Sequence, residues 1–381
     1  MGHERMAFGM RMRVLGAALA ILALIAAILA GQARAVPANF WGVVPQLTPS
    51  AEQFQRLKRG GVDSVRMAIS WGSVQPLRNG PYDFSGSDAV VGAAAAAQID
   101  VLPFLVGAPT WAVPSAVVPR SGGFRTTKFL PVRSGVQRSG WRNFVIQVIQ
   151  RYGPTGTFWT ENPTLPRRPI RAWQIWNEPN FKYFVVRPNP AEYGKLVKIS
   201  SGAIKAADPG AHLILGGLFA RPIEAEIEAG PPQAYFAADF LDLMYRSTPG
   251  IKSMFHGYAL HPYTGSYKNL TSRIEEVREV LKVNRDAGKG LWVTELGWSS
   301  QPARAGNSFA KGLNGQAAQL KGAFGLLRAK QRKWQIQRVY WFSVDDLKGA
   351  CNFCDGSGLF SKGFVPKPSW RAYVRFAGGT P

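Results

Sequence analysis

The sequence contains few cysteines, few histidines and few acidic residues. Among its 381 residues are two cysteines and four histidines, with no His-x-x-x-His pair. A zinc site built from four cysteines therefore has too few ligands, and we expect no metal site. Asp and Glu number 23 against 46 Lys and Arg, which gives a formal net charge of +23. A field of this sign attracts polyanions such as nucleic acid, anionic lipid or acidic polymer.

Signatures of several protein classes are also missing. No glycine-rich dinucleotide loop follows the first apolar run, and the chain has no Gly-x-Ser-x-Gly elbow and no phosphate-binding loop. These absences argue against esterases and nucleotide-dependent enzymes, and we expect no cofactor. Lys and Arg are scattered rather than interleaved with aromatic residues, so we expect no nucleic-acid partner. The 46% hydrophobic content excludes a disordered chain and allows a sizeable core.

The first 35 residues have the composition of a targeting segment. Residues 3–13 carry three arginines and one acid, Val14 to Ala30 is a run of 17 uncharged residues, and Ala33-Arg34-Ala35 follows. This order predicts a secretory signal peptide cleaved after Ala35. The alternative is an uncleaved membrane anchor, because such a run is just long enough to span a bilayer. We therefore expect a secreted protein whose functional domain is residues 36–381, with membrane contact only if the segment is retained.

The two cysteines lie close together in the sequence Cys-Asn-Phe-Cys, at Cys351 and Cys354. No second pair completes a zinc site, and no helix-opening context suggests a thioredoxin-type centre. In an oxidising compartment we expect them to form a small disulfide that pins one loop.

Short apolar runs recur along the chain, each followed by a helical stretch. Between 24 and 70 residues separate the starts of successive runs, which fits strand–helix units and excludes hairpins. Eight such units predict an α/β fold, a single (β/α)8 barrel, with an insertion between strands three and four near Gly107–Gly140. A doubly wound open sheet is the competing fold. The runs are Phe40–Val43, Ser64–Ile69, Val101–Val106, Arg171–Trp176, Leu213–Gly216, Gly257–Leu260, Leu291–Thr294 and Val339–Phe342.

The helical stretches are recognised by their period. Apolar residues from Trp141 to Tyr152 recur at the spacing of one helix face, and Gly153-Pro154 follows as a stop. A second stripe of this kind lies within 274–281.

Carboxylates follow two of the apolar runs, where a barrel keeps its functional groups. The fourth run leads into Trp-Asn-Glu-Pro-Asn, which contains Glu178, and the seventh leads into Thr-Glu-Leu-Gly-Trp, which contains Glu295. Cleavage of a glycosidic bond needs two carboxylates in unlike environments. The neighbours of Glu178, Trp176 and Pro179, disfavour its charged form and suit a general acid. Donors such as Tyr263 and Arg66 can keep Glu295 ionised, which suits a nucleophile.

Asn177-Glu178-Pro179 and Thr294-Glu295 resemble the two signatures of clan A of the glycoside hydrolases. The resemblance covers nearly all of residues 36–381 and is strongest to family 39 and family 5. It implies a retaining enzyme, with Glu178 as acid/base, Glu295 as nucleophile and Asn177 as donor to the substrate 2-hydroxyl. The chain departs from the family 5 pattern at strand three, where Phe104–Trp111 supplies no histidine.

The same resemblance implies further substrate contacts. His261-Pro262-Tyr263 resembles the His-x-Tyr of the sixth strand, and Arg66 resembles the arginine of the second. Trp341 resembles the platform under the cleaved sugar. Because aromatic faces often bind sugar rings, Trp298 and Trp111 are further candidates. The substrate is then an oligo- or polysaccharide, and the protein is expected to be a monomer.

Alternatives remain at this point. The fold also suits a carbohydrate-binding barrel that lacks catalysis and stays at the cell wall, or an inverting hydrolase with more widely spaced carboxylates. Glu178 could instead pair with an arginine such as Arg171, His261 could be a satisfied barrel-mouth histidine, and Trp341 could be buried. The basic field leads us to hypothesise an anionic envelope or a uronic-acid-bearing polysaccharide as a neighbour of the protein.

Overall fold

The computed structural model describes residues 36–113, 126–220, 227–228, 232–347 and 354–381. The chain divides into two compact units, residues 1–38 and 39–381, and the fold below is that of the second. The expected signal segment lies outside the described residues, as does Cys351. Among the helices that are described, none combines the length and the apolar character that crossing a bilayer requires.

Eight parallel strands close into a barrel, as the sequence predicts. Around the ring the order is β1, β2, β3, β6, β7, β8, β9 and β10, with β10 pairing back to β1. Each of the eight predicted runs coincides with one strand, to within three residues at either end. The strands are β1 (Trp41–Val44), β2 (Ser64–Ser70), β3 (Asp100–Val106), β6 (Ala172–Asn177), β7 (His212–Phe219), β8 (Gly257–His261), β9 (Gly290–Leu296) and β10 (Ile336–Phe342).

The strands appear in the sequence as continuous apolar runs because both of their faces are covered. Within β9, every residue from Leu291 to Leu296 is buried, as expected for a parallel strand between a barrel interior and outer helices. Gly42 of β1 lies against the ring of Tyr340 in β10, where a Cβ would overlap that ring. The Tyr340 hydroxyl is 2.8 Å from Oγ of Ser64 in β2. Tyr340 of the last strand thus contacts both of the first two strands, β1 and β2.

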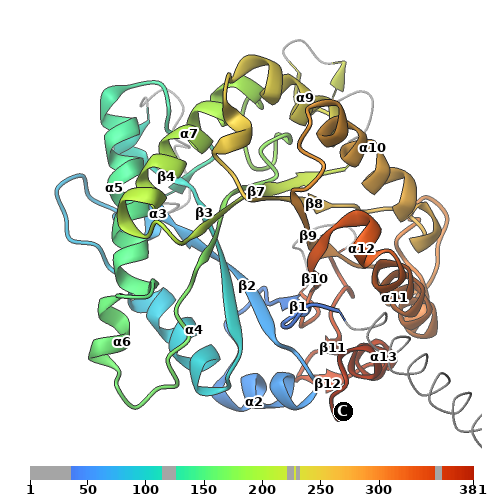
Figure 1. Ribbon diagram of the computed structural model, residues 1–381. Helices are drawn as coiled ribbons and strands as arrows, with labels where there is room; N and C mark the ends of the chain where they lie inside the picture. The colour runs from blue at the N-terminus through green and yellow to red at the C-terminus, as the bar shows by residue number, and fades with distance from the viewer. Residues whose placement is uncertain (1–35, 114–125, 221–226, 229–231, 348–353) are drawn as a thin grey trace, which may run out of the picture. The chain divides into compact units, whose positions relative to one another are not determined.

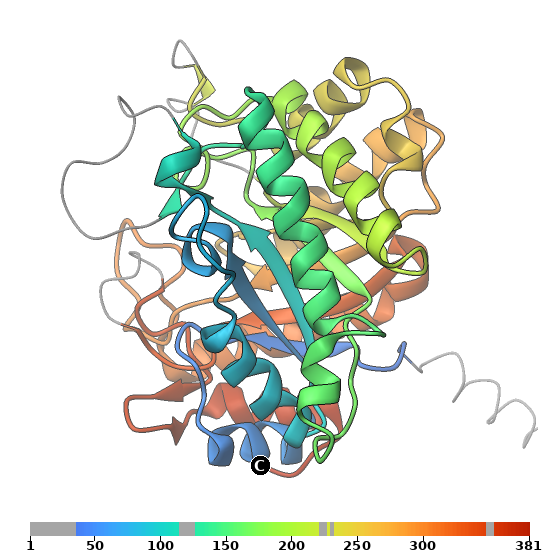
Figure 2. The same cartoon turned by 90° about the vertical axis from the view of Figure 1, so that its left-hand side faces the viewer.

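Helices surround the ring of strands (Figure 1). The helix predicted from Trp141 to Tyr152 is confirmed as the second part of α5, which Ser134 and Gln137 cap at its start. α5 and α7 pack side by side along the outside of the barrel (Figure 2). The longer helices are α2 (Ala51–Arg59), α4 (Ser85–Ala96), α5 (Gly135–Tyr152), α7 (Pro190–Ala207), α9 (Ala237–Ser247), α10 (Leu270–Val283), α11 (Gly312–Ala329) and α13 (Pro368–Ala377).

Short elements fill the connections between strands and helices. In the region of the predicted insertion, β4 pairs with β5 in antiparallel fashion and the 3-10 helix η1 lies between them in sequence. α5 already begins at Gly135, so the last part of Gly107–Gly140 is helix, and residues 114–125 lie outside the described part. The insertion therefore stays a prediction. The short elements are α3 (Trp71–Val74), β4 (Ala108–Pro109), η1 (Thr110–Ala112), β5 (Thr126–Thr127), α6 (Thr157–Glu161), η3 (Ile251–Ser253), η4 (Tyr267–Asn269), α12 (Gln331–Trp334), β11 (Phe360–Ser361) and β12 (Val365–Pro366).

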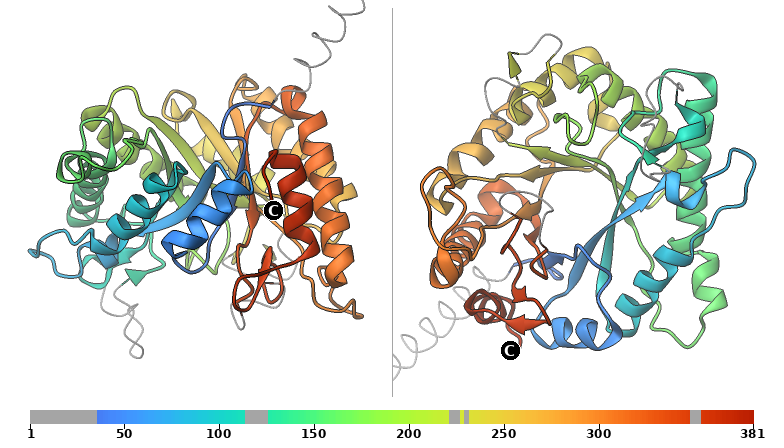
Figure 3. Two further views of the ribbon diagram at one scale, coloured as in Figure 1. Left: turned by 90° about the horizontal axis from the view of Figure 1, so that it is seen from below. Right: turned by 180° about the vertical axis from the view of Figure 1, so that it is seen from behind.

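The residues at the C-terminal end of α2 contact the last helix, α13, which packs along α11 (Figure 3). The backbone N–H of Thr380, just beyond α13, donates to the carbonyl of Arg59 in α2 at 2.8 Å. The indole ring of Trp370 in α13 lies so close to Gly60 that a Cβ there would overlap it. The two ends of the barrel sequence therefore hold each other in place.

Candidate active site

A cavity of about 1080 Å³ opens at the carboxyl ends of the strands. Its wall includes Arg66 from β2, Asn177 and Glu178 from the end of β6, Tyr263 beyond β8 and Glu295 from β9. The sequence predicts these five residues as site residues, and the barrel brings them together from strands far apart in the chain. Parallel strands that all end at one rim explain why such separated residues meet.

Arg66 lies at the centre of the site and is fully buried. Its guanidinium donates from Nη1 to Oε1 of Glu295 at 2.6 Å and from Nη2 to Oδ1 of Asn177 at 2.6 Å. The third donor, Nε, contacts Oε1 of Gln174 in β6 at 2.7 Å. The guanidinium also lies over the ring of Phe104, 4.1 Å from its centroid. One planar group with fixed donors thus sets the positions of a carboxylate and two amides.

Glu295 is held by two donors. Besides Arg66, the Tyr263 hydroxyl donates to its Oε2 at 3.0 Å. Burial raises the pKa of the Glu295 carboxyl, while the charge of Arg66 and the two hydrogen bonds lower it. Burial also raises the pKa of Tyr263 well above its ordinary value, so this hydroxyl stays protonated and remains a donor. Arg66 and Tyr263 are thus the two groups that donate hydrogen bonds to Glu295.

Glu178 has a different environment. Its Oε1 lies 2.7 Å from Nδ1 of His261, whose Nε2 lies 3.0 Å from Oγ1 of Thr294. Burial raises the pKa of Glu178 well above its usual value, the charge of Glu295 raises it further, and Arg66 opposes the shift. Burial lowers the pKa of His261 well below its ordinary value, so the imidazole is neutral. Glu178 is thus the carboxyl of the pair that retains its proton more readily.

The backbone that presents Glu178 is unusual. Trp176 has a φ of 72° and Glu178 a φ of 40°, both in the left-handed region that side chains other than glycine rarely adopt. The indole of Trp176 is fully buried, and its Nε1–H donates to the carbonyl of Phe184 at 3.1 Å. The predicted alternative partner of Glu178, Arg171, instead faces Asp208 at 3.8 Å.

The two carboxylates and His261 approach one another closely. One carboxylate oxygen of each Glu and one imidazole nitrogen all lie within 4.8 Å of one another. Such a cluster could in principle hold a cation. However, both ring nitrogens of His261 already face Glu178 and Thr294, and the Arg66 guanidinium bound to Glu295 repels positive ions. The arrangement is better suited to proton transfer than to metal binding.

The predicted tryptophan contacts differ from the structure. Trp341 is fully buried, lies 6.1 Å from the ring of Trp298 and packs on Phe324 of α11, so it faces the outer helices. Its neighbour Phe342 lines the cavity instead, because successive side chains of a strand point to opposite faces.

The other two candidate tryptophans are also engaged in packing. The Trp298 indole donates to the carbonyl of Thr264 at 2.8 Å, and Trp111 donates to the carbonyl of Gln75 at 3.1 Å. No tryptophan in the described ranges lines the cavity, and eleven of the twelve are buried. The abundance of tryptophan therefore serves the core.

Phenylalanine and tyrosine supply the aromatic wall that was expected of tryptophan. Phe181 stacks on Phe219 with ring centroids 4.9 Å apart, and Tyr183 meets Phe181 edge-on at 4.8 Å. The full aromatic lining is Phe104, Phe181, Tyr183, Phe184, Phe219, Tyr263 and Phe342.

Gln174 is a further site residue, and it was not predicted from the sequence. It is fully buried inside the barrel and contacts Arg66. The available signal was a polar residue in the middle of the apolar run Ala-Trp-Gln-Ile-Trp. Cys354 also borders the cavity, but its expected partner Cys351 is not among the described residues, so the disulfide stays a prediction.

Comparison with known proteins agrees with this geometry. Residues 219–373 match the family model of the glycosyl hydrolase catalytic core. A β-xylosidase from Geobacillus stearothermophilus is 34% identical over 257 residues, covering 62% of this chain and 45% of that protein. The chain thus spans less than half the length of this curated relative.

Similar folds are found among solved structures. A family 39 glycoside hydrolase from Bacteroides cellulosilyticus WH2 aligns with a TM-score of 0.61 and 22% identity, covering 91% of this chain and 64% of that one. A GH39 β-xylosidase from Caulobacter crescentus aligns at 0.61 with 20% identity, over 90% and 72% of the two chains. A GH5_18 protein from Bifidobacterium longum subsp. infantis aligns at 0.60 with 13% identity, over 89% and 78%.

The matched segment, residues 219–373, contains Tyr263 and Glu295, and the structural alignments extend the similarity to the whole barrel. The resemblance to family 39 and family 5 is confirmed, and the chain is similar to the clan A glycoside hydrolases.

Proposed function

We propose that the protein is a retaining β-glycosidase that acts by double displacement, with Glu178 as acid/base and Glu295 as nucleophile. The observation that carries this proposal is the pair of facing carboxyl groups with unequal pKa shifts. One oxygen of each carboxyl group lies within 4.8 Å of the other, and this close approach supports the spacing of retaining enzymes, about 5–5.5 Å between carboxyl groups, over the wider spacing of inverting ones.

In the first step, a carboxylate oxygen of Glu295 attacks the anomeric carbon while Glu178 transfers its proton to the leaving oxygen. In the second step, Glu178 removes a proton from water, and the water oxygen displaces Glu295 and releases the sugar. Arg66 and Tyr263 hold the nucleophile in place between the two steps. Because Arg66 occupies Oδ1 of Asn177, the Nδ2 donors of Asn177 are the groups left to contact a sugar hydroxyl.

We take a β-xyloside as the first substrate class to test, because the curated relative is named a β-xylosidase. A barrel that only binds carbohydrate has no need of two buried facing carboxyl groups, which disfavours the alternative function. We further propose that the protein is exported, on the strength of the apolar run and the Ala33-Arg34-Ala35 sequence.

Replacing the nucleophile tests the assignment. Glu295→Ala is expected to lose at least about 10³-fold in turnover of an aryl β-xyloside, since no group remains to form the covalent intermediate. Added azide should restore turnover and give a glycosyl azide of inverted configuration, detected by NMR. For Glu178→Ala, azide should give the retained product instead. Glu276→Ala, on the solvent side of α10, serves as the control and should behave like the unmodified protein. Undiminished activity of Glu295→Ala would refute the proposed role.

A further inference from the structure

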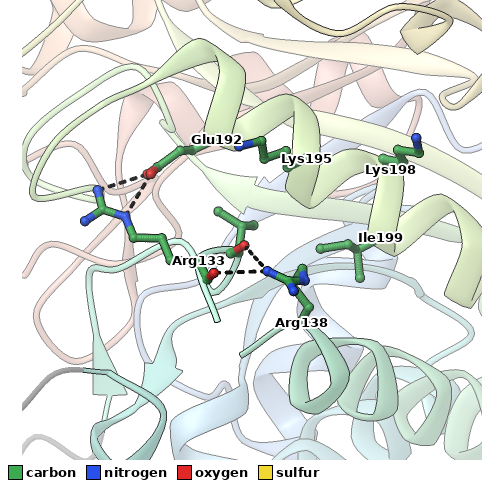
Figure 4. Close-up of a pocket in the computed structure, with 7 residues that line it drawn as sticks. Arg133, Arg138, Glu192, Lys195, Lys198 and Ile199 are labelled. Carbon is green, nitrogen blue, oxygen red and sulfur yellow. Dashed lines mark hydrogen bonds and ion pairs between the residues drawn. The ribbon is translucent and has the colours of Figure 1, made fainter. Parts of the chain in front are cut away.

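A second pocket lies on the outside of the barrel, between α5 and α7 (Figure 4). Its volume is about 440 Å³, and four of its lining residues are basic while one is acidic. The lining residues are Val132, Arg133, Arg138, Glu192, Lys195, Lys198 and Ile199. No step of the proposed reaction uses any of them.

The one acid of this basic pocket is already paired. Arg133 donates to both oxygens of Glu192, from Nε at 2.8 Å and from Nη2 at 3.3 Å (Figure 4). Arg138 is held at the pocket by hydrogen bonds to the carbonyls of Val132 and Arg133. Within the described ranges, Lys195 and Lys198 have no acidic partner and are exposed. Three positive groups therefore remain available to a ligand.

The surrounding sequence does not neutralise this charge. Between Asp100 and Glu161 there is no acidic residue, yet this stretch contains seven Lys and Arg. From 179 to 207 Glu192 is the single acid, against five Lys and Arg. Along these two stretches, which contain α5 and α7, basic residues therefore greatly outnumber acidic ones.

The basic pocket lies at the same end of the barrel as the cavity, because each helix starts at the rim where the preceding strand ends. Val132 and Arg133 precede α5, and Arg138 and Glu192 lie in the first turns of α5 and α7. Lys195, Lys198 and Ile199 follow in the second and third turns of α7. The chain between β6 and α7 connects the two sites. Tyr183 and Phe184 line the cavity, and two residues later the N–H of Val186 donates to the carbonyl of Lys128 at 3.1 Å.

We propose that this basic pocket binds carboxylate groups of an acidic polysaccharide, one that carries uronic acid units, whose chain also enters the cavity. The inference rests on the proposed glycosidase function and names its substrate class. A carboxylate is favoured because Arg133 already holds one, that of Glu192, in two-pronged fashion. A polysaccharide is favoured over a lipid surface because the exposed aromatic residues closest in sequence, Tyr183 and Phe184, face the cavity that a flat bilayer would cover.

The experiment measures binding of polygalacturonate to the full chain by affinity electrophoresis, in parallel with turnover of a neutral aryl β-xyloside. The double variant Lys195→Gln, Lys198→Gln is expected to bind the polymer about five- to tenfold more weakly at low salt, and the difference should shrink at high salt. Its turnover of the aryl glycoside should not change. The matched control Lys205→Gln, Lys321→Gln removes equal charge from exposed positions, one of them at the far end of α7, and should bind as the unmodified protein does.

The two proposals fail separately. If both double variants bound the polymer equally well, the proposed role of the basic pocket would be refuted. Turnover of the aryl glycoside, and with it the proposed glycosidase function, would be unaffected. If the protein did not turn over the aryl glycoside but still bound the polymer through Lys195 and Lys198, only the proposed glycosidase function would be refuted. Preferential binding to phosphatidylglycerol vesicles or to dextran sulfate, with no affinity for polygalacturonate, would also refute the assignment of a carboxylated polysaccharide.

Discussion

At the scale of single residues, the site depends on two carboxyl groups whose charges affect each other. Burial raises both pKa values, but only Glu295 has direct Arg66 and Tyr263 donors that oppose this. The sequence predicted that both acids lie at the ends of apolar runs; Glu178 directly follows β6, whereas Glu295 is the second-last residue of β9. It could not predict that Phe342 rather than Trp341 faces the cavity. Val-Tyr-Trp-Phe is apolar at every position, so no alternation of polar and apolar residues indicates which side chains point into the barrel.

The interaction between the charges of Glu178 and Glu295 affects how activity depends on pH. In the proposed mechanism Glu178 is the acid and must be protonated, so the rate should fall as pH rises through its raised pKa. The proposed nucleophile Glu295 must be ionised, so the rate should also fall as pH drops through the pKa of Glu295, which burial raises. Glu295→Gln removes a neighbouring negative charge, and the pKa of Glu178 should therefore decrease, measured by 13C NMR titration of labelled Glu side chains. Glu192→Gln, on the outer surface, is the control. An unchanged Glu178 pKa in Glu295→Gln would show that the two charges do not interact.

At the scale of elements, β7 makes room for the histidine of the neighbouring strand. Gly217 packs against the imidazole of His261, and a Cβ there would overlap its Nε2. The predicted run in this region ended at Gly216, whereas the strand continues to Phe219, since a Gly-Gly pair reads as a strand end. The two-residue strands β4, β5, β11 and β12 escaped prediction because they are too short to show a period.

Gly217→Ala should displace His261 from Glu178. Displacement of His261 is expected to lower kcat/KM for an aryl glycoside by about 100-fold, because a misplaced group at a reacting site commonly has an effect of this order. Gly194→Ala in α7 is a matched control, because its Cβ would overlap Thr248 on the outer layer. It should reduce thermal stability but leave kcat/KM of the folded protein unchanged. Similar losses of kcat/KM in both variants would mean that the effect is general rather than local to His261.

At the scale of the whole barrel, the contact between α13 and the end of α2 joins the last part of the outer helical layer to the first. Trp370 is fully buried and stacks with Tyr373, with ring centroids 5.8 Å apart. The barrel could be predicted from the count and spacing of apolar runs, because parallel strands require crossovers. The particular partners of the terminal helix could not, since amphipathic spacing defines a buried face without naming what covers it.

Trp370→Ala should lower the free energy of unfolding by about 3–5 kcal/mol, the usual effect of emptying a large buried site. Urea denaturation followed by circular dichroism measures it. Because Trp370 does not line the cavity, kcat of the remaining folded protein should be unaffected. Val283→Ala at the exposed end of α10 provides the comparison, with an expected change within about 0.5 kcal/mol. A Trp370→Ala protein as stable as Val283→Ala would disprove the closing role of α13.

The left-handed backbone at Glu178 has a consequence for engineering this protein. Each residue other than glycine in that region of φ and ψ is disfavoured by about 1–3 kcal/mol, and here one of them is Glu178, the residue that we propose as acid/base. A library screened for heat resistance alone would enrich glycine at this position and yield robust but inert molecules. Laboratory evolution of this scaffold should therefore score product formation in every round.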